Sequence, residues 1–335
     1  MIVGAGVMGL ATARVLAEAG RDVVVLEQFD LDHDRGSSHG SSRIFRLSYP
    51  EAEWVRLAQK ALPLWRDLEA ECGEILLELH GSVDIGEWGA NRDALAACGA
   101  AFELLDQEEA ERRFELRLKP GERALFQPEG GIAVADRTLL ALANSARQHG
   151  ARIREQARVV AVRDGGLEVE VELEDELLRA RTAVVTAGAW APRLVDLDAR
   201  PTRETTAYFA CKRPLPSLVD GTLAAQIYGY GLSAPGLGAK AGLHKSGPRV
   251  DPDEPGEPDV AVALEAGEWL ARRFPAISPE PVRMETCLYT NLAEDRFTLE
   301  RRGRVVVGSP CSGHGFKFAP LIGKRLAELA TEVLV

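Results

Sequence analysis

The sequence predicts an α/β protein of two domains, one built around a parallel sheet and the other around a mixed or antiparallel sheet. A strand–glycine turn–helix–strand unit opens the chain, and further glycine turns follow buried strands in "VVTAGAW" and "VVVGSPCSGHG". Because these turns are far apart and strand-rich segments separate them, the parallel-sheet domain has to be discontinuous. We expect it to comprise residues 1–80, 131–200 and 283–335, with residues 81–130 and 201–282 forming the second domain.

The first unit, "MIVGAGVMGLATARVLAEAGRDVVVLEQ", has the pattern of a Rossmann-like dinucleotide-binding fingerprint. Gly4-x-Gly6-x-x-Gly9 opens a helix, and a second buried strand leads into Glu27. The first glycine permits the turn, the second lets the backbone approach a pyrophosphate, and the third lets helix and strand pack closely. The pyrophosphate binds at the helix N-terminus, and Glu27 accepts hydrogen bonds from a ribose. The unit alone is compatible with NAD or FAD, and its short first strand leaves open whether residues precede Met1.

The composition excludes several classes of protein. The 335 residues are 46% hydrophobic and 27% charged, which is typical of a globular protein of this size. A net charge of −11 argues against a nucleic-acid surface, because phosphate binding requires a basic patch. No apolar run reaches the roughly 18 residues of a membrane helix, and the glycine-rich start does not resemble a signal peptide. Five scattered cysteines without Cys-x-x-Cys spacing predict a reducing, cytoplasmic location and no disulfide framework.

Two motifs in "FDLDHDRGSSHG" resemble other kinds of site without matching them. The alternating aspartates resemble a calcium loop, but its sixth position, which requires glycine, is Arg35. Gly36-x-Ser38-x-Gly40 has the spacing of a hydrolase nucleophile elbow, but polar and acidic residues precede it where a buried strand is needed. The six histidines show no metal-ligand spacing, so we expect no metal ion.

Hydrophobic periodicity predicts the main elements between these motifs. We expect an amphipathic helix over 51–72, a strand over 78–86, a charged helix over 93–114, and a turn, helix and strand over 130–153. Near the C-terminus, "RVVV" is a strand that leads into "GSPCSGHGFKF". A final helix follows with Pro320 in its first turn, where proline is tolerated.

The motifs "GSSHGSSRIFRLSY", "YGYGLSAPGLGAKAGLH", "METCLYT" and "CSGHGFKF" follow the fingerprint in this order. Together they resemble the monomeric sarcosine oxidase and N-methyltryptophan oxidase family, which belongs with the D-amino-acid oxidase and glycine oxidase flavoproteins. The resemblance extends over essentially the whole chain. It implies FAD rather than NAD, a Rossmann-like FAD-binding domain, and oxidation of a carboxylate-bearing secondary amine by oxygen, with release of hydrogen peroxide.

The resemblance also implies which residues hold FAD. Cys287 matches the cysteine that tethers FAD through an 8α-S-cysteinyl bond, and the alternative is a buried structural cysteine. Arg43 matches an arginine that lies against a face of the isoalloxazine, and His39 matches another contact of the cofactor. The expected cofactor-binding residues are Gly4, Gly6, Val7, Met8, Gly9, Glu27, Gln28, Ser38, His39, Ser42, Arg43, Val159, Ala187, Gly188, Trp190, Cys287, Gly313, Gly315, Phe316 and Lys317.

Five residues are implied to act on the substrate or on oxygen. Arg46 and Lys317 match the two cations that hold the substrate carboxylate, one as a planar fork and the other as a point charge. Lys240 matches the lysine that activates dioxygen, where a cation stabilises developing negative charge. His244 matches a histidine that influences ionisation of the substrate amine, and Tyr228 lines the pocket. Three further tyrosines would complete this pocket: Tyr49, Tyr230 and Tyr289.

Two other functions remain open from the sequence. One is a flavin-dependent dehydrogenase that passes electrons to a quinone or another acceptor, and the other is a flavin- or NAD-binding protein without turnover. The motifs do not distinguish sarcosine, N-methyltryptophan, a cyclic imino acid such as pipecolate, or a biosynthetic intermediate as the substrate. We expect a small-molecule amine and oxygen as partners, no nucleic acid or membrane, and a monomer or small homo-oligomer.

Overall fold

A parallel sheet forms the first layer of the computed structural model, which describes residues 1–223 and 228–332. Its strand order is β19-β20-β13-β1-β2-β9, and all neighbours are parallel except the edge pair β19 and β20. The strands are β1 (Ile2–Val3), β2 (Val24–Leu26), β9 (Arg152–Arg154), β13 (Ala183–Val185), β19 (Thr298–Arg302) and β20 (Val305–Ser309). Segments from the beginning, middle and end of the chain therefore meet in one sheet, as predicted.

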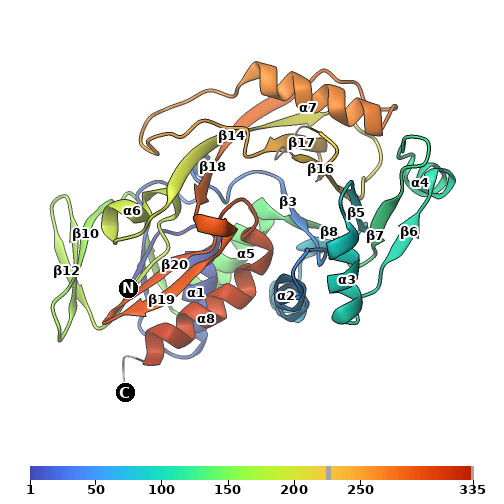
Figure 1. The fold of residues 1–335 in the computed structure, drawn as a ribbon. Coiled ribbons are helices and arrows are strands. Elements are labelled where there is room, and N and C mark those ends of the chain that lie inside the picture. Colours follow the sequence, from blue (N-terminus) through green and yellow to red (C-terminus); the bar gives the residue numbers. More distant parts are fainter. Residues whose placement is uncertain (224–227, 333–335) are drawn as a thin grey trace.

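Four helices lie together on this sheet (Figure 1). Helix α1 (Val7–Glu18) packs against α5 (Ala135–Gln148) and α8 (Ala319–Thr331), and α2 (Ala52–Cys72) packs against the latter two. Their apolar faces share one core with the sheet. The helix predicted over 51–72 and the final helix are confirmed. Within 130–153 the predicted helix and strand are confirmed as α5 and β9, but residues 131–134 form a strand where a turn was predicted.

A small antiparallel meander lies beside the parallel sheet. It consists of β10 (Val159–Asp164), β11 (Val169–Leu173) and β12 (Leu177–Ala180). Valines of β11 pack with β1, β13 and β20 in a second core. The chain then returns through a 3₁₀ turn, η1 (Gly188–Trp190), and the short helix α6 (Ala191–Leu194).

A mixed eight-stranded sheet forms the other half of the molecule. Its order is β18-β14-β17-β16-β15-β5-β7-β6, with only β15 and β5 parallel. Helix α7 (Val260–Arg273) covers one face, above β14, β16 and β17 in Figure 1. The strands are β5 (Ser82–Ile85), β6 (Glu103–Leu105), β7 (Ala124–Gln127), β14 (Arg200–Phe209), β15 (Ser217–Asp220), β16 (Tyr228–Ala234), β17 (Gly238–His244) and β18 (Arg283–Asn291).

A three-stranded antiparallel sheet lies between these two halves. It consists of β3 (Ser42–Phe45), β8 (Gly131–Val134) and β4 (Leu77–Glu78). Its apolar side chains pack against Leu232 and Tyr230 of β16. Two further 3₁₀ turns, η2 (Ala293–Asp295) and η3 (Phe316–Phe318), precede β19 and α8 respectively.

The helix predicted over 93–114 is wrong. The structure has α3 (Gly89–Ala97), then β6, then α4 (Gln107–Phe114). Gly99 ends the first helix with φ +65°, and Asp106 caps the second by accepting from the Glu109 amide. Helix-forming residues alone did not reveal this interruption, because β6 forms only by pairing with β7.

The division of the chain into two domains stays a prediction. One core lies under the parallel sheet and its helices, and a separate core lies between the eight-stranded sheet and α7. Residues 283–291 form β18, which pairs with β14 along its whole length. The predicted boundary at residue 283 therefore assigns to the first domain a strand that belongs to the second sheet.

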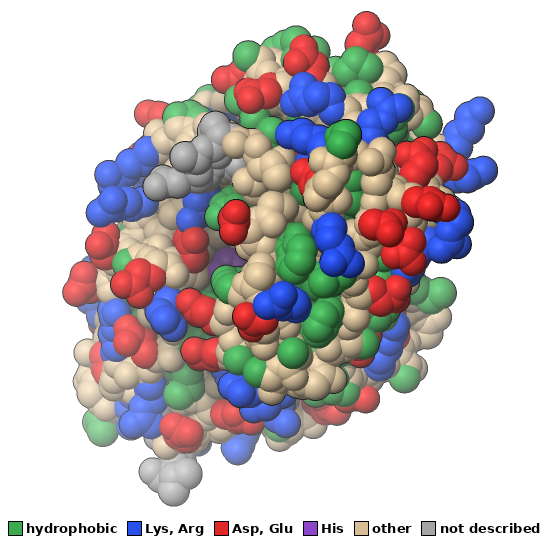
Figure 2. All heavy atoms as spheres, turned by 45° about the vertical axis from the view of Figure 1, so that its right-hand side comes forward, with side chains coloured by type: hydrophobic (Ala, Val, Ile, Leu, Met, Phe, Trp, Pro, Cys, Tyr) green, Lys and Arg blue, Asp and Glu red, His purple; other side chains and the backbone are tan. Residues whose placement is uncertain are grey.

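No helix in residues 1–223 or 228–332 is long and apolar enough to cross a membrane. Acidic and basic side chains are interspersed on the face shown in Figure 2, where no large field of positive charge occurs. Steering of a polyanion would require such a field.

Substitution of Gly9 by alanine should destabilise the protein. A Cβ atom at Gly9 would lie 1.9 Å from the Gly4 carbonyl oxygen, so α1 would have to move away from β1. Such overpacking costs about 1–3 kcal/mol, which urea unfolding measures. The control is Gly89→Ala, because a Cβ there meets no atom within 4 Å. Equal stabilities of the two variants would contradict the close packing of α1 on β1.

Candidate active site

One cavity of about 950 Å³ brings together residues of the parallel sheet, β3, the eight-stranded sheet and the loop before α8. Every residue that the sequence predicted for the site lines this cavity, with the exception of Gly9. Gly9 lies instead where α1 crosses β1, in the packing role predicted for the third glycine. The binding roles of the lining residues remain predictions, but the fold does place them around one space.

One end of the cavity lies at the turn between β1 and α1. Gly4 has φ +97°, which favours glycine, and a Cβ there would lie 2.8 Å from the Thr186 carbonyl oxygen. Gly6 is the N-cap of α1, no acidic residue lies in the first turn, and the Val7 amide donates to Ser38 Oγ at 3.1 Å. The helix therefore presents amide groups and the positive end of its dipole to the cavity, an arrangement suited to a phosphate.

Glu27 follows β2 at the same end of the cavity. Its two carboxylate oxygens accept from the Ala5 amide at 2.8 Å and the Phe29 amide at 3.0 Å. A carboxylate has about four acceptor positions, so two remain for a ligand hydroxyl. The walls around this end include Met8, Gln28, Val159, Ala187, Gly188 and Trp190.

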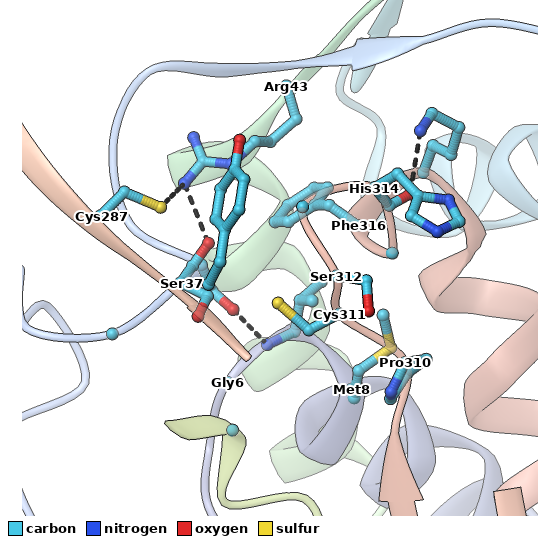
Figure 3. Close-up of a pocket in the computed structure, with 18 of the residues that line it drawn as sticks. Gly6, Met8, Ser37, Arg43, Cys287, Pro310, Cys311, Ser312, His314 and Phe316 are labelled. Carbon is cyan, nitrogen blue, oxygen red and sulfur yellow. Dashed lines mark hydrogen bonds between the residues drawn. The ribbon is translucent and has the colours of Figure 1, made fainter. Parts of the chain in front are cut away.

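Arg43 and Cys287 face each other in the middle of the cavity (Figure 3). Arg43 donates to the carbonyl oxygens of Ser37, His39 and Ser42 at 2.9, 2.6 and 2.8 Å, and its Nη2 lies 4.0 Å from Cys287 Sγ. Burial raises the pKa of the Cys287 thiol, while the positive charges of Arg43 and Lys240 oppose that effect. The Ser42 hydroxyl is already used, since it donates to the Ser233 carbonyl oxygen at 2.7 Å.

The loop from β20 to α8 forms the opposite wall. Gly315 is required by packing, because a Cβ there would lie 1.6 Å from the Pro310 carbonyl oxygen. Gly313 has φ +78° and lies close to the rings of Tyr289 and His244. The ring of Phe316 lies under the Arg43 guanidinium, with 5.8 Å from Cζ to the centroid (Figure 3).

Two cations lie next to Tyr49 at the far end of the cavity. Arg46 Cζ lies 4.9 Å from the centroid of the Tyr49 ring, and Lys317 Nζ lies 5.4 Å from it. Lys317 Nζ donates to Tyr49 Oη at 2.8 Å and to the His314 carbonyl oxygen at 2.9 Å. Both acceptors are uncharged, so neither neutralises the ammonium, and one of its hydrogens stays unused. Burial, with a smaller effect of Arg46, lowers the pKa of Lys317 well below its ordinary value.

Asp84 of β5 was missed from the sequence. Its Oδ1 accepts from Arg46 Nη1 at 2.6 Å, while the carboxylate is 95% buried. Burial raises the pKa of Asp84, and Arg46 opposes that effect. With Arg46, Lys317 and Asp84 all ionised, this end of the cavity carries one net positive charge, which suits one ligand carboxylate. The available signal was the single acid in the buried strand "SVDI".

Lys240 of β17 is 97% buried and faces the middle of the cavity. Its Nζ donates to Glu285 Oε1 at 3.0 Å, and Glu285 was also missed from the sequence. Burial and the Arg43 charge lower the pKa of Lys240 to about 8, while Glu285 opposes the shift. Glu285 precedes Cys287 by two residues in a strand, so strand periodicity would have placed both on one face.

His244 and Tyr228 lie at the rim of the substrate end. Their ring centroids are 6.3 Å apart, and Tyr228 is 46% exposed, which leaves it a marginal wall. Burial lowers the pKa of His244 to about 4 and that of His314 to about 3. His314 Nε2 lies 2.9 Å from the Asp295 carbonyl oxygen, so this nitrogen donates and Nδ1 is left to accept from Tyr49 Oη at 3.3 Å. Both imidazoles are therefore neutral at pH 7.

Other site chemistries find little support. In the part of the chain that the structure describes, no group of three or more His, Cys, Asp or Glu side chains is arranged to hold a metal ion. Gly36-x-Ser38-x-Gly40 is a loop and not an elbow, because no strand immediately precedes Ser38. The five cysteines are all free thiols.

The comparisons with known proteins agree with this site. The chain matches the family described as FAD dependent oxidoreductase over residues 1–329, and it belongs to that family. The predicted resemblance and the predicted enzyme class, an FAD-dependent oxidoreductase, are thereby confirmed.

Individual relatives show which members of this family the chain is similar to. The chain is 32% identical to the peroxisomal sarcosine oxidase of Homo sapiens, with 99% of this chain and 92% of the relative covered. It is 28% identical to the N-methyl-L-tryptophan oxidase of Salmonella heidelberg, with 98% and 94% covered. Among solved structures, NikD, an amino acid oxidase essential for nikkomycin biosynthesis, superimposes with a TM-score of 0.89 at 28% identity, covering 99% of this chain and 93% of that one.

The cavity fits FAD, the cofactor of this family. It extends from the amides of α1, through the Arg43 and Cys287 region, to the two cations beside Tyr49. The amide groups at the N-terminus of α1 suit the pyrophosphate, Glu27 suits the ribose, and the glycine loops leave space where side chains would collide. His39 Nε2 is buried without a hydrogen-bond partner among the described residues, as expected for a group that faces a ligand.

The three buried histidines of the site should stay neutral across the physiological range. Burial lowers the pKa of His39 and His244 to about 4 and that of His314 to about 3, so each gains a proton only in acid. Their imidazole NMR signals should not move between about pH 5 and 8. Substitution of each histidine by asparagine assigns its signal. A site signal that titrates near about pH 6.5 would contradict the burial of that ring.

Proposed function

We propose that this protein is an FAD-dependent oxidase of carboxylate-bearing secondary amines, such as N-methyl amino acids or cyclic imino acids. The observation that carries the proposal is the pair of cations next to Tyr49, at the end of the cavity away from the fingerprint. The pair has one carboxylate partner, Asp84, within the described ranges, so one positive charge is free for the substrate. The names of the relatives, sarcosine and N-methyl-L-tryptophan oxidases, support this substrate class.

Arg46 and Lys317, called the substrate clamp from here on, bind and orient the substrate. Arg46 uses one N–H on Asp84 and has others to offer a carboxylate, and Lys317 has one free hydrogen beside its two protein acceptors. Trp65 fixes the backbone of this lysine, because its indole N–H donates to the Lys317 carbonyl oxygen at 2.7 Å. A carboxylate held at two points leaves little rotational freedom for the adjacent amine carbon, and such orientation accounts for much of the catalysis.

The two cations next to Tyr49, and not the histidines, control the protonation of the amine. Neutral His244 and His314 add no positive charge, but the two cations of the clamp lower the pKa of an ammonium bound beside them. The amine therefore binds as the neutral base, with its lone pair available to stabilise the imine. Bound FAD would supply the two-electron acceptor between the substrate C–N unit and oxygen, so that amine and O₂ would become imine and hydrogen peroxide. Water then hydrolyses the imine.

Covalent attachment of FAD through Cys287 Sγ is the second part of the proposal. Burial raises the pKa of the Cys287 thiol, but Arg43 Nη2 at 4.0 Å and the positive charge of Lys240 oppose this effect and support the thiolate, which is the nucleophilic form of cysteine. Lys240 is proposed to serve the oxygen reaction, because its ammonium faces the cavity and would stabilise negative charge that develops on O₂. A cytoplasmic location and a monomer or small homo-oligomer complete the proposal.

The clamp is tested by a panel of amines scored by peroxide release. Arg46→Met and Lys317→Met should each lower kcat/KM by about 10- to 100-fold, since a charge-assisted hydrogen bond contributes about 1.5–3 kcal/mol. Lys245→Met is the matched control, because Lys245 pairs with Asp295 at the surface. Amines without a carboxylate should respond equally to all three variants. FAD reduction by an amine without peroxide release would instead identify a dehydrogenase.

The tether is tested by acid precipitation. The parent protein should retain its yellow colour in the pellet, and Cys287→Ser should release FAD into the supernatant. Cys311→Ser is the control, because Cys311 lines the same cavity and should leave the linkage intact. Release of all flavin from the parent would refute the covalent bond and leave the amine oxidase proposal untouched.

A further inference from the structure

Glu285 lies behind Lys240 and does not line the cavity. Glu285 Oε1 accepts from Lys240 Nζ at 3.0 Å and from Tyr208 Oη at 2.5 Å. Gly40 lies over this pair, since a Cβ there would come within 2.8 Å of Glu285 Oε1 and 3.5 Å of Lys240 Nζ. The chain thus encloses Lys240. Neither the substrate clamp nor the fingerprint accounts for this enclosure.

The groups that face Lys240 come from four directions. They are Arg43 of β3, Tyr208 of β14, Glu285 and Cys287 of β18, and His39 from the loop before β3. Burial and hydrogen bonding to Glu285 raise the pKa of Tyr208 to about 12, burial raises that of Cys287, and burial lowers that of His39 to about 4. At neutral pH, the ionised groups of this cluster are therefore Arg43, Lys240 and Glu285.

One carboxylate thus compensates two buried cations. Burial opposes the ionisation of Glu285, but the Lys240 charge and the Tyr208 hydrogen bond outweigh it, so the pKa of Glu285 is lowered. Arginine cannot release its proton in a protein, whereas a buried lysine does so readily. If Glu285 lost its charge, Lys240 would therefore be the group that becomes neutral.

We propose that Glu285 is a positioning residue for Lys240: its carboxylate holds the lysine charged and directed at the cavity, and so sets the pH range in which the reduced enzyme reacts with oxygen. This inference rests on the proposed oxidase function, in which two electrons and two protons convert O₂ to hydrogen peroxide. A lysine with a pKa of about 8 is charged below that pH, so the oxygen reaction should slow as pH rises through it. Loss of Glu285 moves the midpoint to lower pH.

The test compares the second-order rate constant of anaerobically reduced enzyme with O₂ across neutral and alkaline pH. In Glu285→Gln the midpoint should fall by at least about one pH unit, so the loss in rate should be about threefold at about pH 7.5 and approach about tenfold near about pH 9. Glu285→Asp keeps the carboxylate but moves it away from Lys240, so the midpoint should shift less. This variant also provides the test if the glutamine variant does not fold. Arg283→Gln is the control, because Arg283 is an exposed partner of Glu285 at 3.5 Å.

A second readout does not depend on turnover. The absorption spectrum of oxidised, FAD-loaded enzyme should change with the same midpoint, and Lys240→Met should abolish that transition. In the double variant Glu285→Gln/Lys240→Arg, the permanent charge should make the oxygen reaction independent of pH over this range.

The outcomes separate the inference from the function that it rests on. Unchanged midpoints in Glu285→Gln would overturn the inference and leave a purely structural ion pair, even if the variant were less stable. Negligible oxygen reaction of the parent would overturn the oxidase proposal, while the spectral titration would still decide the role of Glu285.

Discussion

The burial of positive charge is the constraint that organises this molecule. Four of the cations that line the cavity are buried or half-buried: Arg43, Arg46, Lys240 and Lys317. Removal of an ion from water costs several kcal/mol unless other groups replace the lost hydration. Each cation meets this cost differently: carbonyl oxygens hold Arg43, carboxylates hold Arg46 and Lys240, and uncharged oxygens hold Lys317. Asp84 and Glu285 pair with two of these four cations, and the charges of the other two suit the proposed ligands, a substrate carboxylate and an electron-rich cofactor.

The fold supplies these partners from distant segments of the chain. Trp65 in α2 fixes the backbone of Lys317, and β5 inserts Asp84 beside β3. The antiparallel pairing of β18 with β14 and of β14 with β17 places Glu285 next to Lys240. A change in any of these registers by one residue would turn the side chains to the opposite face of the sheet. The sheets thus serve the site mainly by fixing which side chains face one another.

The sequence predicted the residues expected to bind ligands better than the acidic residues that pair with the cations of the cavity. Gly4, Gly6 and Lys317 stand in motifs with a known local geometry, so their meeting in one cavity was predictable from the order of the motifs. Asp84 and Glu285 carry no local signal of that kind, because each acquires its role only by pairing with a cation contributed by another element. The same reason explains the wrong helix over 93–114: β6 is defined by its partner strand rather than by its own residues.

The two charge systems of the cavity are built from separate partners, and this separation has a consequence for function. The pKa of Lys317 responds to burial and to Arg46, whereas that of Lys240 responds to burial, Arg43 and Glu285. A carboxylate bound at the clamp therefore changes the charge balance around Lys317 and leaves the groups that control Lys240 in place. Substitutions that alter which amine is accepted need not alter the reaction with oxygen. The architecture thus permits substrate range and electron acceptor to change independently, since Lys317 of η3 and Lys240 of β17 belong to different elements.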